Sequence, residues 1–200
     1  MNDINRRSVL KILSTVPVAA TFALTEVEAQ EAHHLAQAAR QTATKSGVAY
    51  TPKFFTANEY QTVRVLSDLI IPADERSGGA IEAGVPEFMD FTMVDQPARQ
   101  VAMRGGLAWL DGESQRRYDK TFVGASDNER RAILNDLATY GELKPGLTQG
   151  QAFFRSFRDL TATGFWTTKM GMADLGYMGN TVVSKWDGCP PEQLKKLGLV

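Results

Sequence analysis

Six carboxylates lie close together in the sequence around Pro72. They are Asp68, Asp74, Glu75, Glu82, Glu87 and Asp90. Two neighbouring carboxylates can carry out acid–base chemistry or bind a cation. Acidic residues are also common near helix starts, where the helix dipole stabilises a negative charge. The structural role is favoured, and an enzyme or binding module that uses these carboxylates is kept as the alternative.

Motifs for other chemistry are absent from the sequence. There is no HExxH, CxxC or CxxCH pattern, and no glycine cluster has G-x-G-x-x-G spacing. His33 and His34 are adjacent, so their side chains point about 100° apart on a helix and cannot share one metal ion. We therefore predict that this chain binds no cofactor or metal and has no catalytic residues of its own.

A second unusual segment runs from residue 164 to residue 189. It is rich in aromatic residues, methionine and glycine, but it carries four charged residues, Lys169, Asp174, Lys185 and Asp187. Aromatic residues and methionine with few charges are typical of interface cores. The residues predicted to contact a partner are Phe165, Trp166, Tyr177, Met178, Trp186 and Cys189. The alternative is a loop that covers the core of its own domain.

Cys189 is the single cysteine of the chain. In an exported protein, an unpaired cysteine indicates a disulfide to another chain. Many free cysteines instead behave as small buried apolar residues, and the sequence leaves both interpretations open.

The amino terminus has the layout of an export signal. Basic residues precede a weakly apolar stretch from Ile12 to Leu24, which is too short to span a bilayer. Small side chains at Val27 and Ala29 predict cleavage between Ala29 and Gln30. Within this leader, Arg6, Arg7, Leu10 and Lys11 match the twin-arginine motif. That motif predicts export of an already folded protein to the periplasm by the twin-arginine machinery.

Helical periodicity dominates the rest of the chain. Capping-box spacing at Thr56/Glu59, Ser126/Glu129 and Thr148/Gln151 predicts three helix starts, each followed by an apolar stripe. Pro72 should end the first of these helices, and Val85-Pro86 should begin another, with a further helix near Pro97. The expected fold is one all-α domain with a long irregular C-terminal segment. The predicted boundaries are a signal peptide at 1–29, a linker or short exposed helix at 30–53 and the helical domain at 54–200.

The overall composition fits a single globular domain. The chain has 200 residues, of which 43% are apolar and 22% charged, with a net charge of −1. Lys and Arg total 22 against 23 for Asp and Glu, so the chain creates no positive field for a phosphate backbone. Nucleic acid is not an expected partner.

An ordered set of motifs resembles the gluconate 2-dehydrogenase subunit 3 family. Besides the leader, the set comprises Asp68-Leu-Ile-Ile-Pro72, Ala83-Gly84-Val85-Pro86-Glu87-Phe88, Gly164-Phe-Trp-Thr-Thr168, Asp174-Leu-Gly-Tyr177 and Trp186-Asp-Gly-Cys-Pro190. The stretch from Phe165 to Asn180 is also similar to subunits that serve sugar and glucoside 3-dehydrogenases.

The resemblance implies a small, non-catalytic subunit of a periplasmic sugar dehydrogenase. Its partner would be a flavoprotein of the glucose-methanol-choline type that holds FAD, lacks a leader of its own and passes electrons to a cytochrome c. A chain without a cofactor that carries a leader for folded proteins would then act as the export escort and stabiliser of that flavoprotein.

Overall fold

The computed structural model describes residues 25–46, 50–138, 145–177, 179, 182, 185 and 188–199. Arg6, Arg7, Leu10 and Lys11 lie outside the described residues, as do Met178 and Trp186. Over the described ranges the chain forms helices and no strand, so the predicted all-α class is confirmed. The helices are α2 (Glu26–Ser46), α3 (Ala57–Ile70), α4 (Ala80–Ala83), α5 (Val85–Asp95), the 3-10 turn η1 (Pro97–Arg99), α6 (Gln100–Tyr118), α7 (Asp127–Ala138), α8 (Thr148–Trp166), α9 (Lys169–Asp174) and α10 (Pro191–Lys196).

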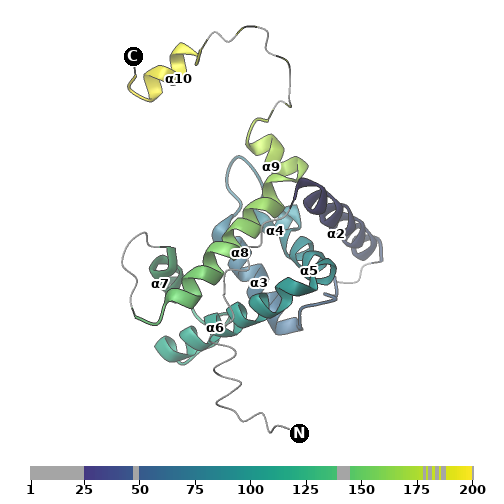
Figure 1. Ribbon diagram of the computed structural model, residues 1–200, viewed down its shortest axis with the longest axis vertical. Helices are drawn as coiled ribbons and strands as arrows, with labels where there is room; N and C mark the ends of the chain where they lie inside the picture. Colours follow the sequence, from purple (N-terminus) through teal and green to yellow (C-terminus); the bar gives the residue numbers. More distant parts are fainter. Residues whose placement is uncertain are drawn as a thin grey trace.

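Helix α8 crosses the middle of the fold, with α2 on one flank and α7 on the other (Figure 1). Its inner face carries the predicted phenylalanine stripe. The buried members of this stripe are Phe153, Phe154, Phe157, Leu160 and Phe165. Helix α5 packs beside α8, and every residue from Val85 to Met93 is buried, which also places the charged side chains of Glu87 and Asp90 inside the protein.

Two glycines allow α6 and α8 to pack closely. A Cβ atom at Gly106 would lie 1.8 Å from the ring of Phe153, and one at Gly150 would lie 2.1 Å from the ring of Trp109. Each helix therefore receives an aromatic ring of the other at a position where only glycine fits. These reciprocal contacts fix how α8 lies along α6.

The buried carboxylate of Asp90 holds the segment that precedes α3. Its side chain has no exposed surface and accepts hydrogen bonds from the Tyr50 hydroxyl at 2.7 Å and from the backbone N–H groups of Lys53, Phe54 and Phe55 at 2.7, 2.9 and 3.1 Å. A buried carboxylate with four donors has its negative charge well compensated. Burial, together with the hydrogen bond to Asp90 and its nearby charge, raises the pKa of Tyr50.

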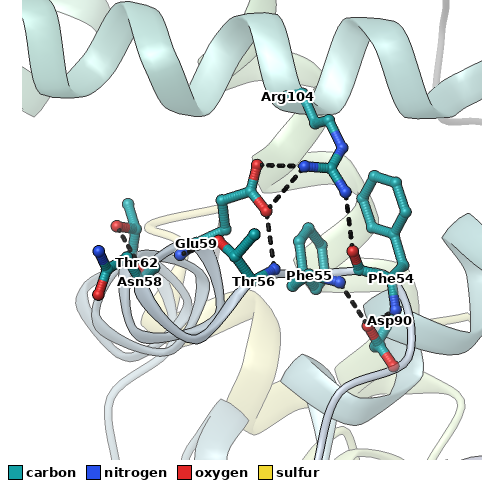
Figure 2. Close-up of polar contacts among 8 residues, drawn as sticks. All are labelled: Phe54, Phe55, Thr56, Asn58, Glu59, Thr62, Asp90 and Arg104. Carbon is teal, nitrogen blue, oxygen red and sulfur yellow. Dashed lines mark hydrogen bonds and ion pairs between the residues drawn. The ribbon is translucent and has the colours of Figure 1, made fainter.

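The same segment leads directly into the predicted capping box of α3. The Glu59 carboxylate accepts from the Thr56 N–H at 2.8 Å, and the Thr56 hydroxyl accepts from the Glu59 N–H at 3.3 Å. Arg104 of α6 donates to Glu59 at 3.0 Å and to the Phe54 carbonyl at 2.9 Å, while its guanidinium lies 4.5 Å from the centre of the Phe54 ring (Figure 2). Asp90 and Arg104 thus hold the turn before α3 from opposite sides.

Residues 30–46 of the segment predicted as a linker or short exposed helix belong to helix α2, one face of which is buried. This helix lies along α5 and reaches α8. Its buried side chains are Ala29, Ala32, His33 and Ala36. Small alanine side chains let a helix approach its neighbour closely but add little to an apolar pattern, which is why the sequence did not indicate a packed helix.

His33 is the one large side chain among the buried residues of α2. Its Nε2–H donates to the Gly164 carbonyl at 2.6 Å, and its ring stacks on Phe88 with centroids 4.8 Å apart. The other ring nitrogen, Nδ1, is buried without a hydrogen-bond partner. Burial therefore lowers the pKa of His33, because a proton on Nδ1 would bring a charge into a site without an acceptor. His34 is exposed and adds a smaller repulsion.

One predicted helix start differs in detail from the structure. The capping boxes at Thr56/Glu59 and Ser126/Glu129 are confirmed, but Thr148 does not cap α8. Instead α8 begins one residue earlier than expected, with Leu147 as its N-cap, and the Leu147 carbonyl accepts from the Gln151 N–H at 2.8 Å. Val101 of α6 is 66% exposed.

Replacing Asp90 with alanine should destabilise the fold strongly. Three backbone N–H groups and one hydroxyl would lose their acceptor inside the protein, which we expect to cost about 3 kcal/mol or more. For a chain of this size, that loss lowers the melting temperature by roughly 6–12 °C. Thermal melts followed by circular dichroism test this. Asp95→Ala, at an exposed position of the same helix, is the matched control and should melt within about 2 °C of the natural protein.

Stability should also depend on His33 as the pH falls below about 6.5. Because folding lowers its pKa below the ordinary value of 6.5, the folded state loses stability as the pH falls below 6.5 and the unfolded chain takes up the proton first. Carboxylates with lowered pKa values, such as Glu129 at about 2, lose their contribution only below about pH 4.5. Melting temperatures at half-unit steps should show the decline in the natural protein and in His34→Gln but not in His33→Gln. An equal slope in all three proteins would contradict the assignment.

Candidate partner interface

The end of α8 leads into a rigid turn. Thr168 is 4% exposed, and its hydroxyl donates to the Phe165 carbonyl at 2.7 Å while accepting from the Gly171 N–H at 3.0 Å. The Thr168 N–H also donates to the Phe165 carbonyl at 3.0 Å. Thr168 is the N-cap of α9, so one side chain both closes α8 and starts the next helix.

The loop between α3 and α4 holds α9 against the body. Arg76 donates to the Asp174 carbonyl at 2.6 Å and pairs with the Asp174 carboxylate at 3.3 Å. The loop itself is held by Asp74, which accepts from the N–H groups of Arg76 and Ser77 at 2.8 and 3.0 Å. These backbone hydrogen bonds lower the pKa of Asp74. The position of α9 is therefore defined at both of its ends.

Beyond α9 the described residues are mostly exposed. We name the described residues from Leu175 to Leu199 the C-terminal arm. Figure 1 shows α10 in this arm set apart from the helical body, and α10 has no buried residue. The apolar side chains of the arm are open to solvent: Leu175 is 61% exposed, Tyr177 56%, Val182 98%, Leu197 69% and Leu199 67%. Met172 of α9 is also exposed, at 38%.

Two of the predicted interface residues belong to the domain itself or to its edge. Phe165 is 1% exposed, so its ring is a core side chain and its assignment to a partner interface is not compatible with this fold. The reason is that α8 continues through Gly164, which brings Phe165 onto the same inner face as Phe157. Trp166 is half-buried at the edge of the core, with its ring edge-on to Phe165 at 4.7 Å.

The remaining predicted residues fall within the arm. Tyr177 is exposed, and Cys189 is a free, exposed cysteine, which disagrees with the interpretation of Cys189 as a buried apolar residue. Met178 and Trp186 cannot be placed, since they lie outside the described residues. Whether these side chains meet a partner stays a prediction.

Sequence reasoning missed several exposed apolar residues of this surface. They are Met172, Leu175, Val182, Leu197 and Leu199. It also missed the helical turn of α9, which starts at the Thr168 cap, and α10, which starts at the Pro190-Pro191 pair. The leucines near the chain end could have been found from one signal in the sequence: they are apolar residues in a segment for which no covering helix is predicted.

The carboxylates around Pro72 are spread over the fold and have structural contacts. Asp90 and Asp74 hold the turns described above, and Glu82 accepts from the Gly79 N–H at 2.9 Å. Glu87 is buried and pairs with Arg40 of α2 at 3.7 Å. Within the described ranges, no three His, Cys, Asp or Glu side chains are arranged so that they could hold a metal ion. These contacts favour the structural interpretation of the cluster.

Comparison with known proteins identifies the family. Residues 57–188 match the model of the gluconate 2-dehydrogenase subunit 3 family. No curated protein and no solved structure matched the chain. None of the helices in the described part of the chain is long and apolar enough to cross a bilayer. The matched region spans α3 to the middle of the C-terminal arm, more than half of the sequence, and the chain therefore belongs to the gluconate 2-dehydrogenase subunit 3 family.

Proposed function

We propose that this protein is the non-catalytic small subunit of a periplasmic, FAD-dependent sugar dehydrogenase, and that the C-terminal arm binds the catalytic flavoprotein. The observation that carries the proposal is the exposed apolar surface of α9 and the arm, in a chain whose family is described as a dehydrogenase subunit. Electrons from the flavin would pass to a cytochrome c, and this chain would hold the complex together.

The arm has the physical properties of a segment that is covered in a complex. A side chain of leucine or valine gains about 1.5–3 kcal/mol when it leaves water. Val182 gains almost none of this free energy in the isolated chain, and Leu175 and Leu197 gain only part of it. Burial on a partner would recover this free energy. The rigid turn at Thr168 and the Arg76–Asp174 pair supply a fixed starting point for the arm, which lowers the entropy cost of binding.

The leader supports the role of export escort. A signal that resembles the twin-arginine type, on a chain whose described residues show no arrangement for a metal ion, is explained if a passenger needs to fold before export. A flavoprotein that must bind FAD in the cytoplasm is such a passenger. The pair would assemble there and leave together by the leader of this chain.

Cys189 adds a covalent possibility to the same surface. Its thiol is exposed in the arm and the sequence contains one cysteine, so a disulfide would join it to another chain, and we propose the flavoprotein as that chain. The rival function, a free-standing enzyme or sugar-binding module based on the Pro72 carboxylates, has no specific observation in its favour, because Asp74 and Asp90 already accept hydrogen bonds from the backbone.

A charge in the arm should weaken binding to the catalytic subunit. We expect Leu175→Asp to reduce the affinity at least about tenfold, since it brings an unpaired carboxylate into an apolar contact, while the melting temperature stays unchanged. The measurement is co-purification of the subunits from periplasm, followed by titration of the separated pair. Val101→Asp is the matched control, because Val101 is 66% exposed on α6 and lies outside the arm. Equal affinities of the two variants would contradict the proposed interface.

Loss of the paired arginines should retain two proteins in the cytoplasm. With Arg6→Lys and Arg7→Lys together, we expect both this chain and the flavoprotein to be absent from the periplasm, together with dye-linked sugar dehydrogenase activity. Cell fractionation with activity assays and immunoblots of both subunits measures this. Arg155→Lys, at an exposed position of α8, is the control and should be exported normally. Normal periplasmic activity in the double variant would refute the escort role.

A further inference from the structure

The predicted cleavage bond, between Ala29 and Gln30, lies inside helix α2. The helix begins with a capping box in which Glu28 accepts from the Thr25 N–H and hydroxyl, both at 2.8 Å, and the Thr25 hydroxyl accepts from the Glu28 N–H at 3.3 Å. The Ala29 N–H then donates to the Thr25 carbonyl at 3.0 Å. The backbone on the N-terminal side of this bond is thus already helical.

The side chain before the bond also faces the protein. Ala29 is 1% exposed and belongs to the hydrophobic core, whereas Val27, two residues earlier, is 73% exposed. A peptidase binds its substrate as an extended strand, with the residue before the bond in a pocket of the enzyme. The helical backbone around Ala29 cannot bind as an extended strand, and the buried Ala29 side chain cannot enter a pocket of the enzyme.

Contacts further along α2 keep this end of the helix in place. Ala32, His33 and Ala36 are buried on the same face, and His33 donates to the Gly164 carbonyl of α8. Near the other end of the helix, Arg40 donates to the Glu82 carbonyl at 2.7 Å. These contacts come from α4, α5 and α8, which exist only in the folded body. The bond is therefore accessible when the body is unfolded or when α2 has left it.

We infer that α2, packed on the body, shields the Ala29–Gln30 bond, so that the folded protein keeps its leader until α2 detaches. The inference rests on the proposed export leader. In the cleavage step a leader peptidase adds water across this peptide bond, which leaves a carboxylate on Ala29 and an amino group on Gln30. Folding would then control processing, and a chain carried in the folded state would still bear its leader when it reaches the peptidase.

The test uses the purified full-length chain with a purified bacterial leader peptidase, followed by intact mass spectrometry. The natural protein should be cut at least about tenfold more slowly than the His33→Asp variant, whose buried carboxylate would face the Gly164 carbonyl and release α2. His34→Asp makes the same change at the adjacent, exposed position and should be cut as slowly as the natural protein. Hydrogen exchange of α2 and α8 peptides reports whether α2 alone is released.

A synthetic peptide covering residues 16–40 keeps the test decisive if His33→Asp does not fold. It contains the bond without the body and should be cut after Ala29 at least about tenfold faster than the full-length chain. Cleavage of the natural protein at a rate close to that of the peptide would overturn the inference, and so would a peptide that is not cut at this bond. Because the assay uses neither the flavoprotein nor the export machinery, its failure is distinct from failure of the escort proposal.

Discussion

The buried carboxylate of Asp90 is the interaction on which the arrangement of the helices depends. It accepts hydrogen bonds from four donors, the Tyr50 hydroxyl and the backbone N–H groups of residues 53–55. These bonds hold the start of α3 against α5. Arg104 then connects the same turn to α6. Helix α5, fixed in this way, is the surface on which α2 lies and against which α8 packs. A local electrostatic requirement, the neutralisation of one charge away from water, therefore sets the positions of helices that are far apart in sequence.

Much of the fold was predictable, and the failures have physical reasons. Capping boxes, Pro72 and the Val85-Pro86 pair predicted α3, α5 and α7 because local hydrogen bonding and backbone restriction determine where those helices begin and end. The packing of helix α2 on the body was missed because its buried face consists of alanines and one histidine, which do not form a recognisable apolar pattern. The leucine N-cap of α8 was equally hidden, since its carbonyl and not its side chain makes the contact.

The candidate interface was predictable as a region but not residue by residue. Depletion of charge and enrichment of aromatic residues pointed to the segment that contains α9 and the beginning of the arm. Composition cannot decide which way a ring faces, however, and Phe165 turns inward because α8 continues past Gly164. The family resemblance rested on ordered motifs across the chain, and the match over residues 57–188 confirms it. The exposed leucines near the chain end needed the three-dimensional arrangement to be noticed.

The glycine contacts between α6 and α8 have a consequence for the mechanics of the molecule. Since Gly106 receives Phe153 and Gly150 receives Trp109, a slide of α8 by one helical turn, about 5.4 Å, would move both rings away from the glycines and against positions that carry a side chain. The two helices can therefore separate but not ratchet past each other. A force on the C-terminal arm is transmitted through α9 to α8, which has no alternative packed position on α6. The body therefore offers the arm a fixed point of attachment.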